Sequence, residues 1–151
     1  MNNAFAALSL SFTIKPTYPV GFFMRVVIYG ASGRMGKALL RLGALDARLQ
    51  IVAAVTGRVA DPGAESFYPA YSVSQLEQLP PFDVAIDFSQ PEAFDAILDL
   101  CRKRKAAFVS GTTGLSELQK QAMSEAANEI PVLWASNFSL GVAVLNDLVR
   151  R

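Results

Sequence analysis

The sequence predicts an α/β fold in which helices pack on a doubly wound parallel sheet. One observation is that apolar runs of strand length alternate along the chain with segments that repeat apolar residues at helical spacing. The other is that the first apolar run, residues 24–29, leads directly into glycines at positions 30, 33 and 36. Such a strand, glycine turn and helix start are typical of a Rossmann-like dinucleotide-binding domain.

Composition limits the size and class of the protein. The chain has 151 residues, of which 52% are hydrophobic, enough for one well-buried domain but not for two of similar size. A net charge of +1 gives no electrostatic case for a nucleic-acid or membrane partner. Histidine is absent, which removes the commonest general base and metal ligand, so we expect no metal site and identify no catalytic residue. The single cysteine, Cys101, lies in a helical apolar stripe and is expected in the core of a cytoplasmic protein.

The chain divides near residue 24. Residues 1–23 contain a short, mildly apolar segment followed by prolines, which we interpret as a flexible N-terminal extension. The folded domain is expected over residues 24–140.

The glycine turn is the feature around which the domain is organised. Its glycines permit positive φ angles and close backbone approach, and the first-turn N–H groups of the next helix could bind an anion. A strand-to-helix turn without a ligand would use the same glycines, and Ala31 stands where the usual fingerprint has its first glycine. The helix that follows has a predicted buried stripe made of Met35, Ala38, Leu39, Leu42 and Leu45.

The middle of the chain continues the alternation. A strand at 51–55 precedes a surface loop at 56–70, and an edge strand is expected at 71–73. Capping-box spacing predicts helix starts at Ser74 and at Ser89, with a buried strand at 84–88 between the two helices. The second helix ends in the basic run 102–105, interpreted as a solvated C-terminus that complements the helix dipole.

The last third repeats the pattern twice. Strands are expected at 106–109 and 131–134. The helix between them is expected to start at Ser116, which has capping-box spacing, and to bury Leu118, Ala122 and Ala126. The final segment carries apolar residues at helical spacing, namely Val142, Leu145, Leu148 and Val149.

Three loops follow predicted strands of this parallel sheet, at residues 30–36, 111–114 and 135–138. Ligands of such sheets bind outside the carboxyl ends of the strands, so the three loops are expected to converge on one crevice. The loop at 111–114 could face a nicotinamide ribose with exposed hydroxyl and N–H groups, or its threonines could serve as helix caps. Asn137 likewise could be a helix N-cap or an amide partner of the cofactor.

The end of the second strand favours NADP over NAD as the cofactor. An acidic residue about twenty positions past the glycines often holds the ribose of NAD, but Thr56 occupies this place. Arg58 and Arg34 are near enough in sequence to attract a 2′-phosphate, although Arg58 could instead be a solvated loop residue. NADPH is therefore the preferred cofactor and NADH the alternative.

Four ordered segments resemble one family. They are GASGRMG at 30–36, FDVAIDFSQPEAF at 82–94, SGTTGL at 110–115 and ASNFSLGV at 135–142. Together they resemble the amino-terminal half of 4-hydroxy-tetrahydrodipicolinate reductase, the dihydrodipicolinate reductase of bacterial lysine and diaminopimelate biosynthesis.

The resemblance implies hydride transfer from NADPH or NADH to a cyclic small-molecule substrate, giving tetrahydrodipicolinate, in a homotetramer. It implies a second, substrate-binding domain, toward which residues 141–151 would begin a connecting helix. It assigns the cofactor diphosphate to the glycine turn, the nicotinamide side to the 111–113 loop, and further cofactor contacts to the 135–138 loop. The cofactor-binding residues expected from spacing and resemblance are Gly30, Ala31, Ser32, Gly33, Arg34, Met35, Thr56, Arg58, Gly111, Thr112, Thr113, Ala135, Ser136, Asn137 and Phe138.

The chain departs from the family pattern in two ways. Relatives often carry an acidic residue where Thr56 stands, and the family's catalytic His-His-Lys segment would begin beyond Arg151. We therefore expect a chain that binds cofactor and is inactive as a reductase. The alternative is a stand-alone NAD(P)-binding or redox-sensing module. A short-chain dehydrogenase is disfavoured because no tyrosine has lysine four residues later.

Overall fold

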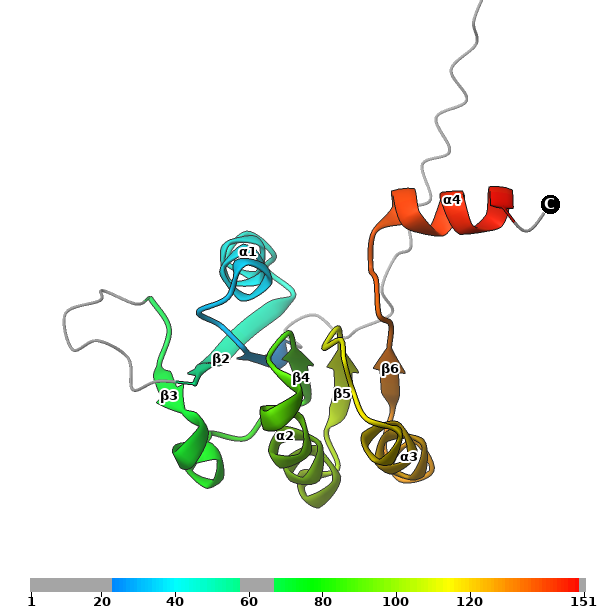
Figure 1. Ribbon diagram of the computed structural model, residues 1–151. Helices are drawn as coiled ribbons and strands as arrows, with labels where there is room; N and C mark the ends of the chain where they lie inside the picture. The colour runs from blue at the N-terminus through cyan, green and yellow to red at the C-terminus, as the bar shows by residue number, and fades with distance from the viewer. Residues whose placement is uncertain (1–22, 58–66, 150–151) are drawn as a thin grey trace, which may run out of the picture.

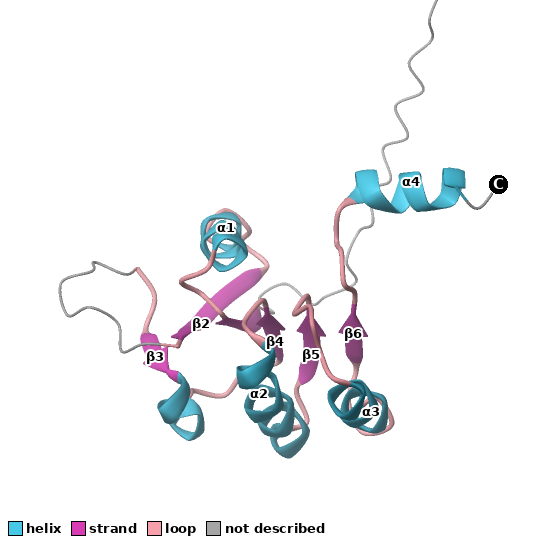
Figure 2. Cartoon of the chain, in the orientation of Figure 1, coloured by secondary structure: helices cyan, strands magenta, loops and turns pink. Residues whose placement is uncertain are grey.

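The computed structural model describes residues 23–57 and 67–149, which form a six-stranded sheet with helices on both faces (Figures 1 and 2). All strand pairs are parallel, in the order β3-β2-β1-β4-β5-β6. The strands are β1 (Met24–Tyr29), β2 (Leu49–Thr56), β3 (Ala70–Ser72), β4 (Val84–Asp87), β5 (Ala107–Ser110) and β6 (Val132–Trp134). The helices are α1 (Arg34–Gly43), the 3-10 helix η1 (Val73–Gln78), α2 (Pro91–Arg104), α3 (Glu117–Ala126) and α4 (Leu140–Val149). The predicted doubly wound α/β fold is confirmed.

Strand β1 lies at the centre of the sheet and separates two layers of core. Val27 and Tyr29 belong to the larger core cluster, which includes residues of α2 and α3, whereas Val26 and Ile28 belong to the smaller cluster that packs against α1. Figure 1 shows α1 on one face of the sheet and α2 and α3 on the other. All four side chains are almost completely buried. A β-branched run buried on both faces is what a central parallel strand requires, as the sequence predicted.

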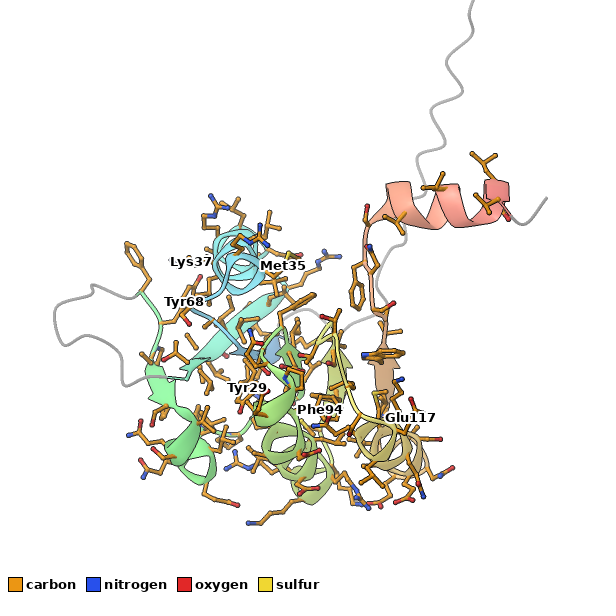
Figure 3. The ribbon with its side chains drawn as sticks, viewed as in Figure 1. Tyr29, Met35, Lys37, Tyr68, Phe94 and Glu117 are labelled. Carbon is orange, nitrogen blue, oxygen red and sulfur yellow. The ribbon has the colours of Figure 1, made fainter. Side chains whose placement is uncertain are left out.

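Helix α2 supplies much of the larger core. Phe94, labelled in Figure 3, is fully buried. Its ring meets that of Phe108 on β5 edge to face, with the centroids 5.5 Å apart. Cys101 is also fully buried, which confirms the prediction of core packing, and this burial raises the pKa of its thiol to about 12. The thiol is therefore a packing group rather than a nucleophile.

Two of the three predicted helix starts are wrong. The short helix begins after Ser72, two residues before Ser74, because the side chain of Gln75 accepts the backbone N–H of Ser72 at 2.9 Å. Helix α2 begins at Pro91 without a side-chain cap, because the backbone N–H of Ser89 donates instead to the carboxyl group of Asp87. The capping box predicted at Ser116 is confirmed.

Two predicted apolar stripes are only partly buried. On α1, Met35 and Leu42 are exposed, and Leu45 lies beyond the end of the helix at Gly43. On α3, Leu118 is 78% exposed, and Met123 packs in the core with Ala126 instead. Each helix is only three turns long and touches the sheet along one narrow line, so residues at the margins of the stripe reach solvent.

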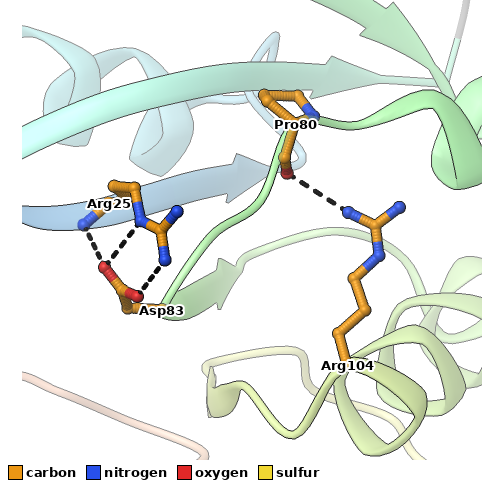
Figure 4. Close-up of polar contacts among 4 residues, drawn as sticks. All are labelled: Arg25, Pro80, Asp83 and Arg104. Atoms are coloured by element: carbon orange, nitrogen blue, oxygen red, sulfur yellow. Dashed lines mark hydrogen bonds and ion pairs between the residues drawn. The ribbon is translucent and has the colours of Figure 1, made fainter.

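The basic run at the end of α2 has specific partners, so the prediction of a purely solvated end is wrong for Arg104. Its guanidinium donates to the backbone carbonyl oxygen of Leu79 at 2.8 Å. It also donates to that of Pro80 at 3.2 Å (Figure 4). The neighbouring cations pair with carboxylates: Arg102 and Lys105 with Glu129, and Lys103 with Glu77.

Another ion pair joins β1 to Asp83, the residue directly before β4. The Arg25 backbone and side chain donate to the Asp83 carboxylate at 2.6 to 3.1 Å, which holds the pKa of that carboxyl below its ordinary value (Figure 4). This pair lies at the amino edge of the two strands, opposite the loops predicted to bind a ligand.

Helix α4 follows β6 and lies apart from the three other α-helices in Figure 1. Leu145 and Leu148 are 58% and 63% exposed on it. Across residues 23–57 and 67–149, no helix is both long enough and apolar enough to span a bilayer.

Candidate functional site

The three predicted loops all follow the carboxyl ends of neighbouring strands, as expected. They come after β1, β5 and β6, and the turn after β4, residues 87–90, lies between them in the strand order. Since the strands are parallel, the four segments share one edge of the sheet. This edge includes the point between β1 and β4 at which the strand order reverses.

The glycine turn is held to the sheet by its own backbone. The N–H groups of Gly30 and Ala31 both donate to the carbonyl of Val55 on β2, at 3.0 and 2.9 Å. Gly33 is the N-cap of α1 and offers no side chain to the first-turn N–H groups, which begin at Arg34. These groups therefore face the space in front of the helix, where an anion could accept from them.

The three glycines have different roles. Gly30 has a φ of +81°, and an added Cβ would also lie 2.7 Å from the backbone carbonyl carbon of Phe88. A Cβ on Gly36 would lie 2.6 Å from the Cα of Ala31, so this glycine lets α1 approach the turn closely. A Cβ on Gly33 would meet only the carbonyl oxygen of Gly30, at 3.2 Å, and would otherwise project into open space. Gly30 and Gly36 serve the fold, and Gly33 borders the candidate ligand space.

The other predicted residues of the turn differ in exposure. Ala31 is buried beneath α1, whereas Ser32, Arg34 and Met35 are exposed (Figure 3 labels Met35). Lys37, one turn further along α1 than Arg34, is also exposed (Figure 3).

The loop after β5 is partly internal. Thr113 and Gly114 are exposed, but Thr112 is only 2% exposed, and its hydroxyl donates to the carboxyl group of Asp87 at 2.8 Å. The expectation that the Thr112 hydroxyl is exposed to a ligand is therefore wrong. Gly111 lies beneath the ring of Phe88, where an added Cβ would come within 2.7 Å of the ring carbons.

The loop after β6 is joined to the loop after β5. The N–H of Ala135 donates to the carbonyl of Ser110 at 3.2 Å. Ser136 and Asn137 are exposed, and the side-chain oxygen of Asn137 accepts the N–H of Ser139 at 2.7 Å. Asn137 thus caps a turn that precedes α4, rather than serving as the N-cap of the helix.

Two aromatic rings cover the middle of this edge. Phe138 is 46% exposed and lies against Phe88 with the ring centroids 5.7 Å apart. Phe88 follows β4 and contacts the glycine positions of two predicted loops, Gly30 through its backbone and Gly111 through its ring. It is a residue that sequence reasoning missed.

The buried carboxyl group of Asp87 was also missed. Asp87 is fully buried, and its Oδ2 atom accepts hydrogen bonds from the hydroxyls of Ser110 and Thr112 at 2.7 and 2.8 Å. Its Oδ1 atom accepts the backbone N–H of Ser89 at 2.9 Å. A carboxylate directly after the apolar run at 84–86 is the signal that could have found it.

The end of β2 lies at the same edge of the sheet. Thr56 is the last residue of β2, where it aligns with Ser72 of the edge strand β3. Arg58 lies outside the described residues. In the part of the chain that the structure describes, cysteine and acidic side chains form no cluster that could hold a metal ion.

The described groups at this edge suit binding better than proton transfer. The phenol of Tyr29 donates to the carbonyl of Ala93 at 3.0 Å, and burial together with the charge of Asp87 raises its pKa to about 12. The remaining features are backbone N–H groups, hydroxyls, two aromatic rings and the exposed guanidinium of Arg34. Such a set can hold an extended anionic ligand.

Comparison with known proteins gives a specific match. The family described as dihydrodipicolinate reductase, N-terminus, matches residues 24–138. The 4-hydroxy-tetrahydrodipicolinate reductase of Stenotrophomonas maltophilia is 58% identical over 129 residues, covering 85% of this chain and 54% of that protein. The reductase of the same name from Xylella fastidiosa is 49% identical over the same proportions. The chain thus spans about half the length of the curated relatives that it matches.

Solved structures agree on the fold. A dipicolinate-bound dihydrodipicolinate reductase from Paenisporosarcina sp. TG-14 superposes with a TM-score of 0.67 at 23% identity, over 82% of this chain and 51% of that one. A 1-deoxy-D-xylulose 5-phosphate reductoisomerase from Zymomonas mobilis, in complex with NADPH, gives a TM-score of 0.53 at 18% identity, over 74% and 38%. With the family match covering β1 to the loop after β6, the chain belongs to the dihydrodipicolinate reductase family and corresponds to its N-terminal part.

Proposed function

We propose that this chain is the NAD(P)H-binding part of a 4-hydroxy-tetrahydrodipicolinate reductase and that it prefers NADPH. The observation that carries the proposal is the position of three loops of the matched region, 30–36, 111–114 and 135–138, at one edge of the sheet. The candidate site fits a dinucleotide because first-turn N–H groups without a side-chain cap and the open space at Gly33 suit a diphosphate.

Different loops of the candidate site would contact different parts of the cofactor. The turn from Gly30 to Met35 would bind the diphosphate, and Gly111 and Thr113 would line the nicotinamide side. Thr112 would contribute by shaping its loop, because its hydroxyl is engaged by Asp87. The loop from Ala135 to Phe138 would close the same side, with the exposed amide of Asn137 and the ring of Phe138 nearest the ligand.

The cofactor, when bound, supplies a hydride. The chain's own residues would orient the nicotinamide and exclude water from one of its faces. We expect this 151-residue chain to bind NADPH without reducing the substrate, since its sequence has no histidine to move a proton. Residues 24–140 would form the cofactor domain, and residues 141–151 would begin a connection to a substrate domain.

The preference for NADPH is proposed from the end of β2. Thr56 places no carboxylate there, so a 2′-phosphate meets no repulsion, and the exposed guanidinium of Arg34 is available to attract it. Arg58 remains a further candidate for this contact.

Titration of the chain with NADPH and NADH tests both parts of the proposal. Trp134 is the only tryptophan, and its indole N–H donates to the carbonyl of Thr112 at 3.0 Å, so its fluorescence should change as the site fills. We expect NADPH to bind more tightly than NADH and no consumption of NADPH when substrate is added. If the chain binds neither NADPH nor NADH, the proposal is wrong.

A charge substitution tests the preference. Thr56→Asp should weaken NADPH binding about tenfold, or ~1.4 kcal/mol, and should strengthen NADH binding. Ser124→Asp adds the same charge on α3, on the far face of the sheet, and should change neither affinity (Figure 1). If Thr56→Asp leaves the NADPH affinity unchanged, the 2′-phosphate does not lie at the end of β2.

A further inference from the structure

The buried group that the proposed function leaves without a role is the carboxyl of Asp87, at the carboxyl end of β4. It lies among the loops of the candidate site, yet it is fully buried and so cannot touch a ligand in this arrangement. Burying a carboxyl group costs free energy that its hydrogen bonds must offset. Its partners therefore indicate what it does for the site.

Those partners lie at the ends of β4 and β5, and one of them, Thr112, is bonded in turn to the end of β6. Within its own turn, Asp87 accepts the N–H of Ser89, and after β5 it accepts the hydroxyls of Ser110 and Thr112, at 2.7 to 2.9 Å. The carbonyl of Thr112 in turn accepts the indole N–H of Trp134, the last residue of β6, at 3.0 Å. The ends of β4, β5 and β6 are thus joined through one carboxyl group and one threonine.

Among the described residues, the side-chain hydrogen bonds of Asp87 go to Ser89, Ser110 and Thr112 and do not reach the glycine turn. That turn is held instead by backbone bonds from Gly30 and Ala31 to Val55, and by the N–H of Phe88, which donates to the carbonyl of Tyr29 at 3.0 Å. The glycine turn is therefore joined to β2 and to the backbone of Phe88, whereas the bonds from Ser110 and Thr112 to Asp87 hold the other half of the candidate site. Loss of those bonds should affect the nicotinamide half more than the glycine turn.

We infer that Asp87 is a positioning residue for the nicotinamide half of the cofactor site. It fixes the 111–114 loop relative to the turn after β4 and, through Thr112, relative to β6. This inference rests on the proposed function, because the nicotinamide side is assigned there. An ordered loop loses less conformational entropy on binding, so the fixed geometry favours the bound cofactor.

The substitution Asp87→Asn tests the inference because it keeps the size of the side chain. The amide retains one oxygen, so it cannot accept from the Ser89 N–H on one side and from two hydroxyls on the other. Two ligands separate the halves of the site: NADPH occupies both, whereas adenosine 2′,5′-bisphosphate lacks the nicotinamide half. We expect NADPH to bind about tenfold more weakly and the bisphosphate to bind within about twofold of wild type. The emission of Trp134 should also shift, since its partner Thr112 is released.

Asp83→Asn is the matched control. Asp83 stands at the opposite end of the same strand, where its carboxylate pairs with Arg25. This variant should lose stability without changing the affinity for either ligand. If Asp87→Asn does not fold by circular dichroism, Ser110→Ala removes one donor to the same carboxyl group and should show the same selective loss, about threefold.

The outcomes separate the two proposals. Selective weakening of NADPH supports the positioning role. Equal weakening of both ligands, or no change in either, overturns it and leaves Asp87 as a structural residue. A wild-type chain that binds the bisphosphate and NADPH equally well would overturn it too, because no nicotinamide half would then contribute. A wild-type chain that binds neither ligand rejects the proposed function itself.

Discussion

Gly36→Ala and Gly33→Ala should separate the structural and the ligand-binding roles of the glycine turn. The two positions are three residues apart in the same turn, yet an added methyl group meets different surroundings. At Gly36 it would lie 2.6 Å from the Cα of Ala31 and 2.8 Å from its carbonyl carbon. At Gly33 it would meet only one oxygen, at 3.2 Å.

The expected loss for Gly36→Ala can be worked from these distances. Carbon atoms pack best about 3.5–4.0 Å apart, so the start of α1 must withdraw by about 1 Å. Overpacking costs about 1–3 kcal/mol, and the value here should be near the upper end because the contacts are with backbone that cannot rotate away. The better helix propensity of alanine returns up to about 1 kcal/mol. We therefore expect a net loss of ~2 kcal/mol, or a melting temperature lower by roughly 8 °C for a domain of this size.

Gly33→Ala should change stability little and should weaken NADPH binding. Its φ and ψ of −72° and 170° suit alanine, and replacement of an N-cap glycine should cost only about 0.5 kcal/mol. The methyl group would occupy the path of the diphosphate, so NADPH should bind at least about tenfold more weakly. Thermal unfolding followed by circular dichroism and titration with NADPH measure the two effects. Equal effects of the two substitutions on both quantities would refute the division of roles among the glycines.

Three further predictions concern the rest of the domain. Phe94→Ala should lower the free energy of unfolding, measured in urea, by about 3–5 kcal/mol, because it removes a fully buried ring and its edge contact with Phe108. A loss under about 1 kcal/mol would contradict this and would mean that the core collapses around the cavity. Asp46 has its pKa lowered to about 2 by hydrogen bonds from Arg48, so the stability it contributes is present above its ordinary pKa of 3.8 and lost as the pH falls toward 2. Asp46→Asn should therefore make the acid slope of stability shallower over that range, and an unchanged slope would contradict the bond. Cys101, with its pKa raised to about 12, should resist iodoacetamide at about pH 8 in the folded chain and react once urea unfolds it; rapid labelling of the folded chain would contradict its burial.

The sheet could be predicted from the sequence because its signals are local. A β-branched run such as 26–28 can be buried on both faces only as an inner strand, and the glycines that follow it indicate the turn. Helix boundaries were harder to predict than the strands. The capping-box spacing occurs at Ser74, Ser89 and Ser116, but only Ser116 has the expected partner, since Ser72 and Gln75 form the box at the first and Asp87 binds the backbone of Ser89 at the second.

The sequence predicted the loops of the candidate site but not Asp87, which lies buried among them. Loops at the ends of parallel strands can be located from strand positions alone. The bonds of Asp87 join it to residues 23 and 25 positions further along the chain, and no spacing rule connects such distant residues. The same limit explains the wrong expectation for the Thr112 hydroxyl, because its direction depends on a carboxyl group from another strand.

The strand order has a consequence for the way in which the domain assembles during synthesis. β1 and β2 pair directly once α1 has formed, and β3 adds to β2, so three of the six strands can associate early. The other neighbour of β1 is β4, and the partners of Asp87 on β5 and in the loop after it emerge later still. Trp134, which bonds to Thr112, follows on the edge strand β6. Pairings between distant segments form slowly, because the intervening loop must first close. The site at the reversal of the strand order is therefore complete only after the strands on both sides of it have paired. A nucleotide that needs the whole site can bind only to chains whose sheet is fully formed.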